Sequence, residues 1–328
     1  MSVGAAAAGT PNRVPIVFMG LMGLDSHNRE EEQLVRRLVE RGHPLLYLPP
    51  LGVRDAGWGD LLLGLRRMRR AGRTANVAPG LRVARLLVLP WRGRRPVAWL
   101  NQRLVRWRLA QALGTLTVER PVLWLRLPTP ELVDQLPQLG ARAVVYDCMD
   151  DYSAYPHYRA PERRRLQEVE QRLVAQADLV VTLTEAIAGR FPTATDRVRI
   201  VPLGVDLERF GHSMGAEPVD LAQLPRPRLG MVGGLDGRID LDLLYRLATA
   251  EPHWSIVLIG PRLGGLNVGP LADLSNVHLL GPRPYENVPE YLAGLDVCLI
   301  PYRRGSWADG CFPTKLHEYL AVGRPVVA

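Results

Sequence analysis

The chain has 328 residues, a length typical of about two domains. Its composition, 47% hydrophobic and 23% charged, is that of an ordinary soluble globular protein and excludes a disordered or fibrous chain. Lys and Arg outnumber Asp and Glu by 41 to 33, giving a net charge of +8, and Lys315 is the single lysine among them.

The N-terminal half of the chain alternates apolar runs with helical patterns. Residues 1–12 lack a basic stretch and a long apolar run, so we interpret them as a flexible terminus and not as a secretory signal. Residues 13–204 are expected to form one Rossmann-like domain with a mostly parallel sheet. Its expected strands are 14–19, 45–48, 121–127, 141–146, 179–183 and 198–201, with a helix at 161–176.

A basic block occupies residues 51–108 of this domain, with 14 arginines against Asp55 and Asp60. Residues 58–73 follow the spacing of a basic amphipathic helix, which suits an anionic membrane surface. The alternative is a helix that packs on the core of the domain. A second cluster, residues 91–108, mixes tryptophans with arginines and has poorer helical periodicity. No nucleic acid is expected as a partner, because no nucleic-acid-binding motif accompanies the charge.

The C-terminal part repeats the alternation of strands and helices. Residues 205–228 are rich in Gly and Pro and are expected to form a linker region, followed by a second α/β domain at 229–328. Its expected strands are 229–232, 255–259, 277–279 and 297–300, and its expected helices are 241–250, 288–293 and 314–321. Residues 325–328 resemble the start of a buried strand, so we expect this domain to be incomplete.

Two features of the second domain predict an anion-binding site at the carboxyl ends of its strands. Gly233 and Gly234 follow a strand and allow close approach of a ligand to the backbone, and Arg238 lies just beyond them. Lys315 and Glu318 share one face at the start of a helix. The alternative for this last pair is an exposed ion pair within the helix.

An acidic cluster follows strand 141–146 in the first domain. Asp147, Asp150 and Asp151 are candidates to bind sugar hydroxyls, to orient an acceptor or to remove its proton. The alternative is an Asx turn that caps the next helix. His27, in the first loop, is a further candidate. No metal site is expected, because the cluster contains no DxD triplet.

The segment PTKLHEYLAVGRPVV at 313–327 closely resembles the donor-binding signature of group 1 glycosyltransferases. Three more segments, 201–206, 233–241 and 276–281, are similar to the same family. The resemblance covers about the last 150 residues well, whereas the first domain matches loosely, through 146–151 and its opening strand. It implies a GT-B fold, in which two tandem Rossmann-like, doubly wound domains face a cleft.

The resemblance also implies a reaction. A nucleotide-diphosphate sugar would bind the second domain, with its diphosphate near Gly234, Arg238 and Lys315 and its ribose near Glu318. Transfer would be retaining and would need no metal or cofactor. Many members carry a second acid eight residues before the position of Glu318; here that position is Gly310, so adjacent Asp309 is the candidate for the sugar contact.

We therefore expect a glycosyltransferase that acts on a polysaccharide or lipid-linked acceptor, cytoplasmic and peripheral at the inner membrane face. One alternative is a nucleotide-sugar epimerase of the same fold. Another is a membrane-associated binding protein that has lost turnover. A nicotinamide dehydrogenase is disfavoured, because the first strand–helix loop at 20–24 lacks the G-x-G-x-x-G spacing.

Overall fold

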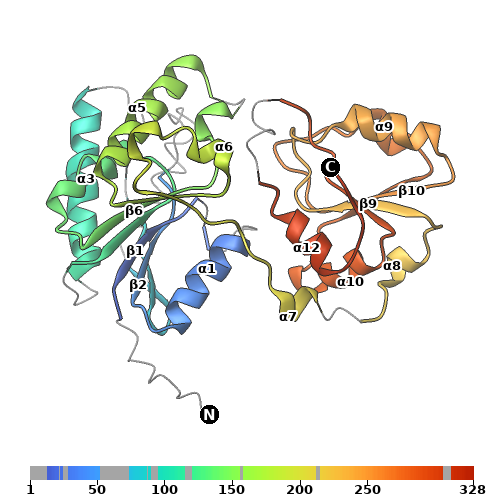
Figure 1. The fold of residues 1–328 in the computed structure, drawn as a ribbon, viewed down its shortest axis with the longest axis horizontal. Helices are drawn as coiled ribbons and strands as arrows, with labels where there is room; N and C mark the ends of the chain where they lie inside the picture. Colours follow the sequence, from blue (N-terminus) through green and yellow to red (C-terminus); the bar gives the residue numbers. More distant parts are fainter. Residues whose placement is uncertain are drawn as a thin grey trace, which may run out of the picture. The chain divides into compact units, whose positions relative to one another are not determined.

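The computed structural model describes residues 13–21, 23–24, 29–51, 74–86, 88–89, 95–114, 120–155, 158–211, 215–305 and 312–328. The chain divides into two compact units, Met1–Val201 and Pro202–Ala328, and each has its own sheet with helices packed against it (Figure 1). Every helix of the described residues is too short or too polar to cross a membrane.

The described part of the first unit is built on an eight-stranded sheet in the order β3-β4-β2-β1-β5-β6-β7-β8. Neighbouring strands pair in parallel, except for the antiparallel hairpin of β3 and β4. The strands are β1 (Ile16–Met19), β2 (Leu45–Leu48), β3 (Ala75–Ala78), β4 (Leu81–Val83), β5 (Val122–Leu125), β6 (Ala143–Cys148), β7 (Leu179–Thr182) and β8 (Val198–Ile200). Strands β1 and β2 are buried throughout, as expected for a parallel sheet covered on both faces.

The helices of the first unit follow the strands in sequence. They are α1 (Arg29–Glu40), α3 (Arg95–Gly114), α4 (Pro130–Val133), α5 (Ala160–Gln176) and α6 (Glu185–Ala188), with short 3-10 turns at Leu136–Gln138, Tyr152–Ala154 and Pro192–Ala194. Three glutamates occupy the first turn of α1, where carboxylates suit the helix dipole. The expected strands and the expected helix at 161–176 are confirmed to within a few residues.

Helix α3 corrects one expectation, because the region with poor helical periodicity contains a regular helix of 20 residues. Its buried face includes two polar residues, Asn101 and Arg108. Asn101 makes hydrogen bonds of 2.6 and 3.0 Å to the backbone of Leu89, and Arg108 donates one of 3.4 Å to Arg85. These bonds satisfy the buried amide of Asn101 and part of the Arg108 guanidinium, whose Nη2 has no hydrogen-bond partner among the described residues. The helix therefore forms without a continuous apolar stripe.

The second unit has a five-stranded parallel sheet, in the order β11-β10-β9-β12-β13 among the described residues. The strands are β9 (Arg228–Val232), β10 (Ser255–Ile259), β11 (Val277–Gly281), β12 (Val297–Leu299) and β13 (Val326–Val327). Its helices are α7 (Leu207–Phe210), α8 (Val219–Ala222), α9 (Leu241–Ala250), α10 (Val288–Ala293) and α12 (Lys315–Ala321), with 3-10 turns at Gly269–Asp273 and Tyr285–Asn287. The expected strands and helices of this unit are therefore present.

The two faces of this sheet carry separate hydrophobic cores. Ile256 and Leu258 of β10 pack on one face with α9, whereas Val257 and Ile259 pack on the other with α10 and α12. This alternation follows the two-residue period of a strand.

Residues 205–228 differ from the expected linker. They include α7 and α8, and Phe210 and Leu221 from these helices are buried in the core of the second unit. This region is therefore part of the folded second unit.

Candidate functional site

The loops after β9 and β10 approach each other closely at the carboxyl edge of the second sheet. Gly233 has φ +132° and donates a backbone hydrogen bond of 2.8 Å to Ile259. Gly260 has φ +146°, and a Cβ at this position would lie 2.0 Å from the carbonyl oxygen of Gly233. Both positions favour glycine, because φ is positive and because a Cβ atom would come close to neighbouring atoms. Gly234 is also closely packed, since a Cβ there would lie 2.7 Å from Leu263.

The ammonium group of Lys315 lies against this glycine loop. Lys315 is the first residue of α12, and its side chain is only 8% exposed. A Cβ on Gly233 would come 3.1 Å from Nζ, and Nζ lies 5.2 Å from the centre of the Tyr302 ring. The structure thus brings together Gly233 and Lys315, two of the residues that the sequence placed in the donor site.

Arg238 contributes a second cation beside the same tyrosine ring. Its guanidinium carbon lies 5.8 Å from the centre of the Tyr302 ring, and Asp236 binds the guanidinium at 2.6 to 2.9 Å. Burial by itself would raise the pKa of Asp236, but the hydrogen bonds from Arg238 and the charge of Lys315 hold that pKa below its ordinary value. Tyr302 is therefore within cation–π distance of two cations, Lys315 and Arg238, of which Arg238 is paired with Asp236.

Glu318 lies one turn after Lys315 and is held by Tyr285. The Tyr285 hydroxyl donates a hydrogen bond of 2.9 Å to Oε1 of Glu318. Burial raises the pKa of Glu318, although the hydrogen bond and the charge of Lys315 act in the opposite direction. Burial and the nearby Glu318 also raise the pKa of Tyr285, so that its hydroxyl keeps its proton and remains a donor.

Tyr319 fixes α12 to the end of β9. Its hydroxyl accepts a hydrogen bond of 3.0 Å from the backbone N–H of Val232 and donates one of 3.2 Å to the carbonyl of the same residue. The ring is fully buried. Since Val232 immediately precedes Gly233, these bonds fix the first turn of α12 relative to the glycine loop.

Sequence reasoning missed the three tyrosines of this site, Tyr285, Tyr302 and Tyr319. A signal existed for two of them, because Tyr302 and Tyr285 follow strands β12 and β11, whose carboxyl ends meet at the same sheet edge as that of β9. Asp309, the candidate for the sugar contact, and its neighbour Gly310 lie outside the described residues.

The structure gives Asp147 of the first unit a buried partner. Its Oδ2 accepts hydrogen bonds from Arg126 Nε at 2.8 Å and from Trp124 Nε1 at 3.0 Å. Arg126 is 1% exposed and also binds Glu30 and Glu31 at the start of α1. Burial alone would lower the pKa of Arg126, but these three carboxylates hold that pKa well above its ordinary value. Asp147 therefore helps to connect β5, β6 and α1.

Asp150 and Asp151 lie in a turn that caps the following helical segment, as in the alternative interpretation of the acidic cluster. Asp151 caps the 3-10 turn Tyr152–Ala154 by accepting hydrogen bonds from the Ser153 N–H at 3.0 Å and hydroxyl at 2.6 Å. Asp150 accepts from the Asp151 N–H at 2.8 Å and from Tyr155 at 2.9 Å. These contacts give both residues a structural role, and their catalytic role stays a prediction. His27 lies outside the described residues.

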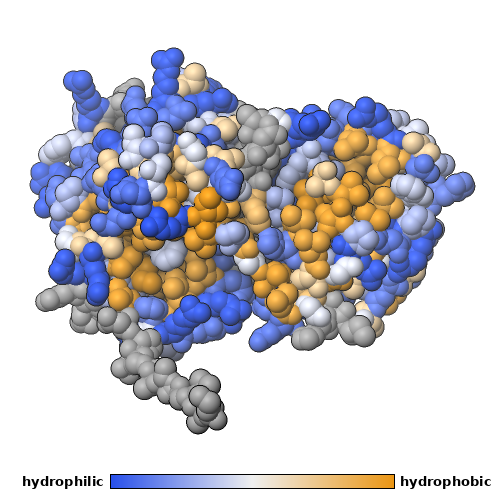
Figure 2. All heavy atoms as spheres, viewed as in Figure 1, coloured by the Kyte–Doolittle hydropathy of each residue, from blue (hydrophilic) through white to orange (hydrophobic). Residues whose placement is uncertain are grey.

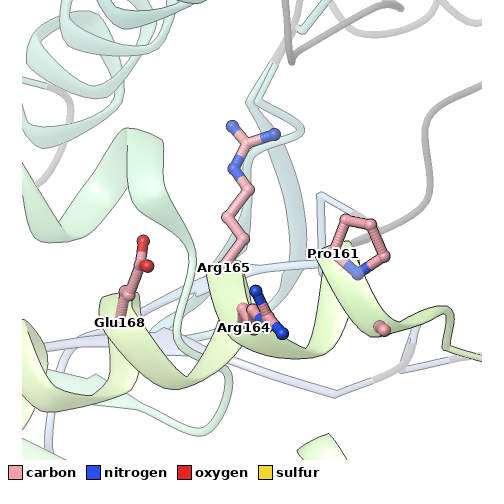
Figure 3. A pocket seen from close by; sticks show the side chains of 5 residues that line it. Pro161, Arg164, Arg165 and Glu168 are labelled. Atoms are coloured by element: carbon pink, nitrogen blue, oxygen red, sulfur yellow. The ribbon is translucent and has the colours of Figure 1, made fainter.

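An open hollow on the first unit is lined by residues of a single helix, α5 (Figure 3). Arg165 and Glu168 project to the same side of the helix in this view, beside Pro161 and Arg164. Of the candidate catalytic and donor-binding residues that the structure describes, none lines this hollow.

Comparison with known proteins assigns the second unit. Residues 226–328 match the family described as "Glycosyl transferases group 1". The second unit is thus similar, over most of its length, to a group 1 glycosyl transferase domain. The domain includes Gly233, Arg238, Lys315 and Glu318, whose geometry is described above.

One relative with sequence similarity carries the name teichuronic acid biosynthesis glycosyltransferase TuaH, from Bacillus subtilis (strain 168). It is 28% identical over 221 residues, which are 64% of this chain and 55% of the relative. The match thus spans about half the length of that relative. It also extends into the first unit, because 64% of this chain is more than the 127 residues of the second unit, Pro202–Ala328.

Solved structures show the fold. Sucrose-phosphate synthase from Thermosynechococcus elongatus matches with a TM-score of 0.67 at 16% identity, over 96% of this chain and 80% of that chain. HepE of Anabaena, solved in complex with UDP-glucose, matches with a TM-score of 0.61 at 16% identity and the same two coverages. The predicted GT-B fold with two Rossmann-like units is confirmed. The cleft between the units stays a prediction.

Proposed function

We propose that this protein is a glycosyltransferase that moves a sugar from a nucleotide-diphosphate sugar to a polysaccharide or lipid-linked acceptor. The observation that carries the proposal is the position of Lys315 Nζ against the backbone of Gly233, with Arg238 beside the same Tyr302 ring. Both cations lie in the group 1 domain, at the carboxyl edge of its sheet.

The chemistry of transfer explains why two cations are useful there. When the bond between the sugar and the diphosphate breaks, negative charge develops on the departing nucleotide diphosphate. Cations that are already in place stabilise that charge without reorganising at the moment of reaction. We propose that Lys315 and Arg238 serve this purpose, so that the transfer needs no metal or cofactor, and that the sugar keeps its anomeric configuration as in the family that the sequence resembles.

Glu318 is suited to bind the nucleoside part of the donor. An ionised carboxylate accepts hydrogen bonds at both oxygens. The two neighbouring hydroxyls of a ribose can each donate one of these hydrogen bonds. Tyr285 fixes one carboxylate oxygen of Glu318, which limits the orientations of the group. We propose Asp309 for the contact with the sugar ring, and Asp147, Asp150, Asp151 and His27 for the acceptor side.

The acceptor and the location of the enzyme are further parts of the proposal. TuaH takes its name from the biosynthesis of teichuronic acid, which supports a cell-envelope polysaccharide or its lipid-linked precursor as the acceptor class here. We propose a cytoplasmic enzyme that is peripheral at the inner membrane face. The basic stretch at 58–73, expected to contact the membrane, lies outside the described residues.

The proposal is tested by nucleotide binding and by turnover of the full chain. Lys315→Met removes the ammonium but keeps much of the side-chain volume, and we expect it to abolish binding of UDP and of other nucleoside diphosphates in a calorimetric titration. Arg246→Met removes an exposed charge of α9 in the same unit and is the control. Unchanged binding in Lys315→Met would refute the donor site.

Product analysis separates the proposed transfer from the two alternatives. Nucleotide sugars incubated without an acceptor should remain unepimerised, whereas an epimerase would convert them. Release of nucleoside diphosphate that depends on an added glycan or lipid-linked acceptor supports transfer. Donor binding without such release would favour a binding protein that has lost turnover.

A further inference from the structure

Helix α3 has a buried face and an opposite, exposed face with a distinct composition. The buried face carries Asn101, Val105, Arg108, Leu109 and Ala112. The exposed face carries Trp99 and Trp107, which are 59% and 58% exposed, together with the exposed Arg103 and Arg106. Residues 99, 103, 106 and 107 follow helical spacing, so these side chains form one stripe. In Figure 1, α3 lies at one edge of the first unit.

The charge of this face has one sign. Helix α3 contains four arginines and no acidic residue, and residues 61–118 contain 13 arginines and no Asp or Glu. Asp134, which accepts a hydrogen bond of 2.8 Å from Gln102 beside the stripe, also pairs with Arg172. A partner of this face therefore meets arginine and tryptophan and must supply the negative charge.

Exposed tryptophan is the second unusual property. Apolar side chains occur at the surface of both units among hydrophilic ones (Figure 2), so exposure alone does not single out α3. However, two tryptophans on one helix face, with the Arg103 guanidinium 4.9 Å from the centre of the Trp99 ring, form a surface that is both amphipathic and cationic. Tryptophan side chains are enriched at the interface between water and the lipid bilayer. The arginine guanidinium can form two parallel hydrogen bonds to one phosphate group.

We propose that the stripe Trp99, Arg103, Arg106 and Trp107 docks on an anionic lipid surface. A second copy of this chain fits the face poorly, because a two-fold axis through the stripe would place its arginines against the same arginines. Single-stranded nucleic acid is bound in positively charged grooves with stacking platforms, whereas this stripe is the ridge of one helix. The proposal extends the membrane location in the proposed function to a specific surface, and its test involves no sugar transfer.

The test is binding of the full chain to vesicles. Vesicles of phosphatidylcholine alone and vesicles with added phosphatidylglycerol are sedimented with the wild type, with Arg103→Gln/Arg106→Gln and with Trp99→Ala/Trp107→Ala. We expect the wild type to bind the anionic vesicles more tightly than the neutral ones. Each arginine near an anionic surface contributes about fivefold, so the double arginine variant should bind roughly 25-fold more weakly. The double tryptophan variant should lose about tenfold or more.

Matched control variants remove similar groups elsewhere. Arg36→Gln/Arg37→Gln removes two exposed charges from α1, and Leu207→Ala/Val219→Ala removes apolar side chains that are 62% and 74% exposed. Both should bind vesicles like the wild type, and all variants should keep the wild-type circular dichroism spectrum.

Four outcomes would overturn the proposal. The wild type could fail to bind anionic vesicles, or the two α3 variants could bind them unchanged, which would place the contact in another part of the chain. Tighter binding to a single-stranded oligonucleotide, lost in the α3 variants, would assign the face to nucleic acid. A wild-type dimer that Trp99→Ala/Trp107→Ala converts to a monomer would assign it to a second copy. In each of these cases nucleotide binding at Lys315 could still be intact, so the proposed transfer stands or falls separately.

Discussion

The hydroxyl of Tyr285 lies 2.9 Å from Oε1 of Glu318 and donates a hydrogen bond to it, across 33 positions of sequence. Tyr285 comes from the turn after β11, and Glu318 comes from the first turn of α12. The ring of Tyr285 is in turn packed edge-on against Phe210 and lies 5.2 Å from the Arg209 guanidinium. The orientation of Glu318 thus depends on a residue that has no expected contact with the donor.

Tyr285→Phe should weaken nucleotide binding while the fold is kept. The change removes only the hydroxyl, and a hydrogen bond to a charged group stabilises by about 1.5–3 kcal/mol, so we expect binding of UDP to weaken by about tenfold or more in calorimetry. Tyr291→Phe is the matched control, since it removes a hydroxyl that bonds Asp220 at 2.8 Å in the same unit. Equal effects of the two variants would show that the Tyr285 hydroxyl has no specific role.

The pH dependence of binding should shift in the same variant. Nucleotide affinity requires ionised Glu318 and is therefore lost as the pH falls through the pKa of Glu318, which burial raises. Tyr285→Phe removes a hydrogen bond that lowers this pKa, so the loss should begin at a higher pH than in the wild type. The variant and the wild type are compared at each pH, so the titration of the nucleotide's own phosphate affects both equally. Both proteins also carry Lys315, so its charge does not contribute to the difference. Parallel profiles would contradict the prediction.

Glu318→Gln should stabilise the protein at neutral pH. Because the folded state raises the pKa of Glu318, this residue favours folding when it is protonated, and that contribution is lost as the pH rises through the folded pKa. Glutamine is neutral throughout and can still accept the hydrogen bond from Tyr285. Thermal unfolding should therefore show a higher Tm for the variant at pH 7 and little difference near pH 4, together with reduced nucleotide binding. A lower Tm at pH 7 would be inconsistent with the burial argument.

Tyr302→Leu should reduce nucleotide affinity, because the ring lies within cation–π distance of Lys315 and Arg238. A cation–π contact contributes about 0.5–2 kcal/mol, so the expected loss is roughly three- to thirtyfold in a titration with UDP. Tyr302→Phe retains the ring and should bind much like the wild type. If Phe and Leu lost affinity equally, the hydroxyl of Tyr302 and not its ring would be responsible.

Arg126→Met should strongly destabilise the first unit. The guanidinium is buried among Asp147, Glu30 and Glu31, and removing one partner of a buried ion pair costs about 3–5 kcal/mol because the other charges stay uncompensated. Arg172 is 51% exposed and pairs with Asp134, so Arg172→Met should cost about 0–1 kcal/mol. Urea titrations of the two variants measure the difference. Equal midpoints would indicate that the buried network contributes little.

The sequence was sufficient to predict which residues lie together where a general rule relates the position of a residue in the chain to its place in the fold. The carboxyl ends of parallel strands meet at one edge, so Gly233 after β9 and Lys315 after β12 could be expected to lie together. The role of Asp151 as a turn cap could also be predicted, because its hydrogen-bond partner Ser153 is only two residues away.

The sequence was insufficient where a residue depends on a distant partner. Nothing local to Asp147 indicates Arg126, since the two meet only when β5 and β6 pair. Helix α3 was underestimated because Asn101 and Arg108 interrupt its apolar stripe, and their hydrogen-bond partners at 89 and 85 belong to a separate segment. The contact between Tyr285 and Glu318 requires the packing of two loops that no periodicity describes.

The pair of hydrogen bonds between Tyr319 and Val232 has an entropic consequence. The buried side chain of Tyr319 has only two rotatable bonds, and its hydroxyl is bonded to the backbone of Val232, so it holds α12 at a fixed distance from β9. The backbone of Gly233 and the ammonium of Lys315 are then already spaced for a ligand before one arrives. When a donor binds there, the protein loses little conformational freedom. More of the contact energy therefore appears as affinity.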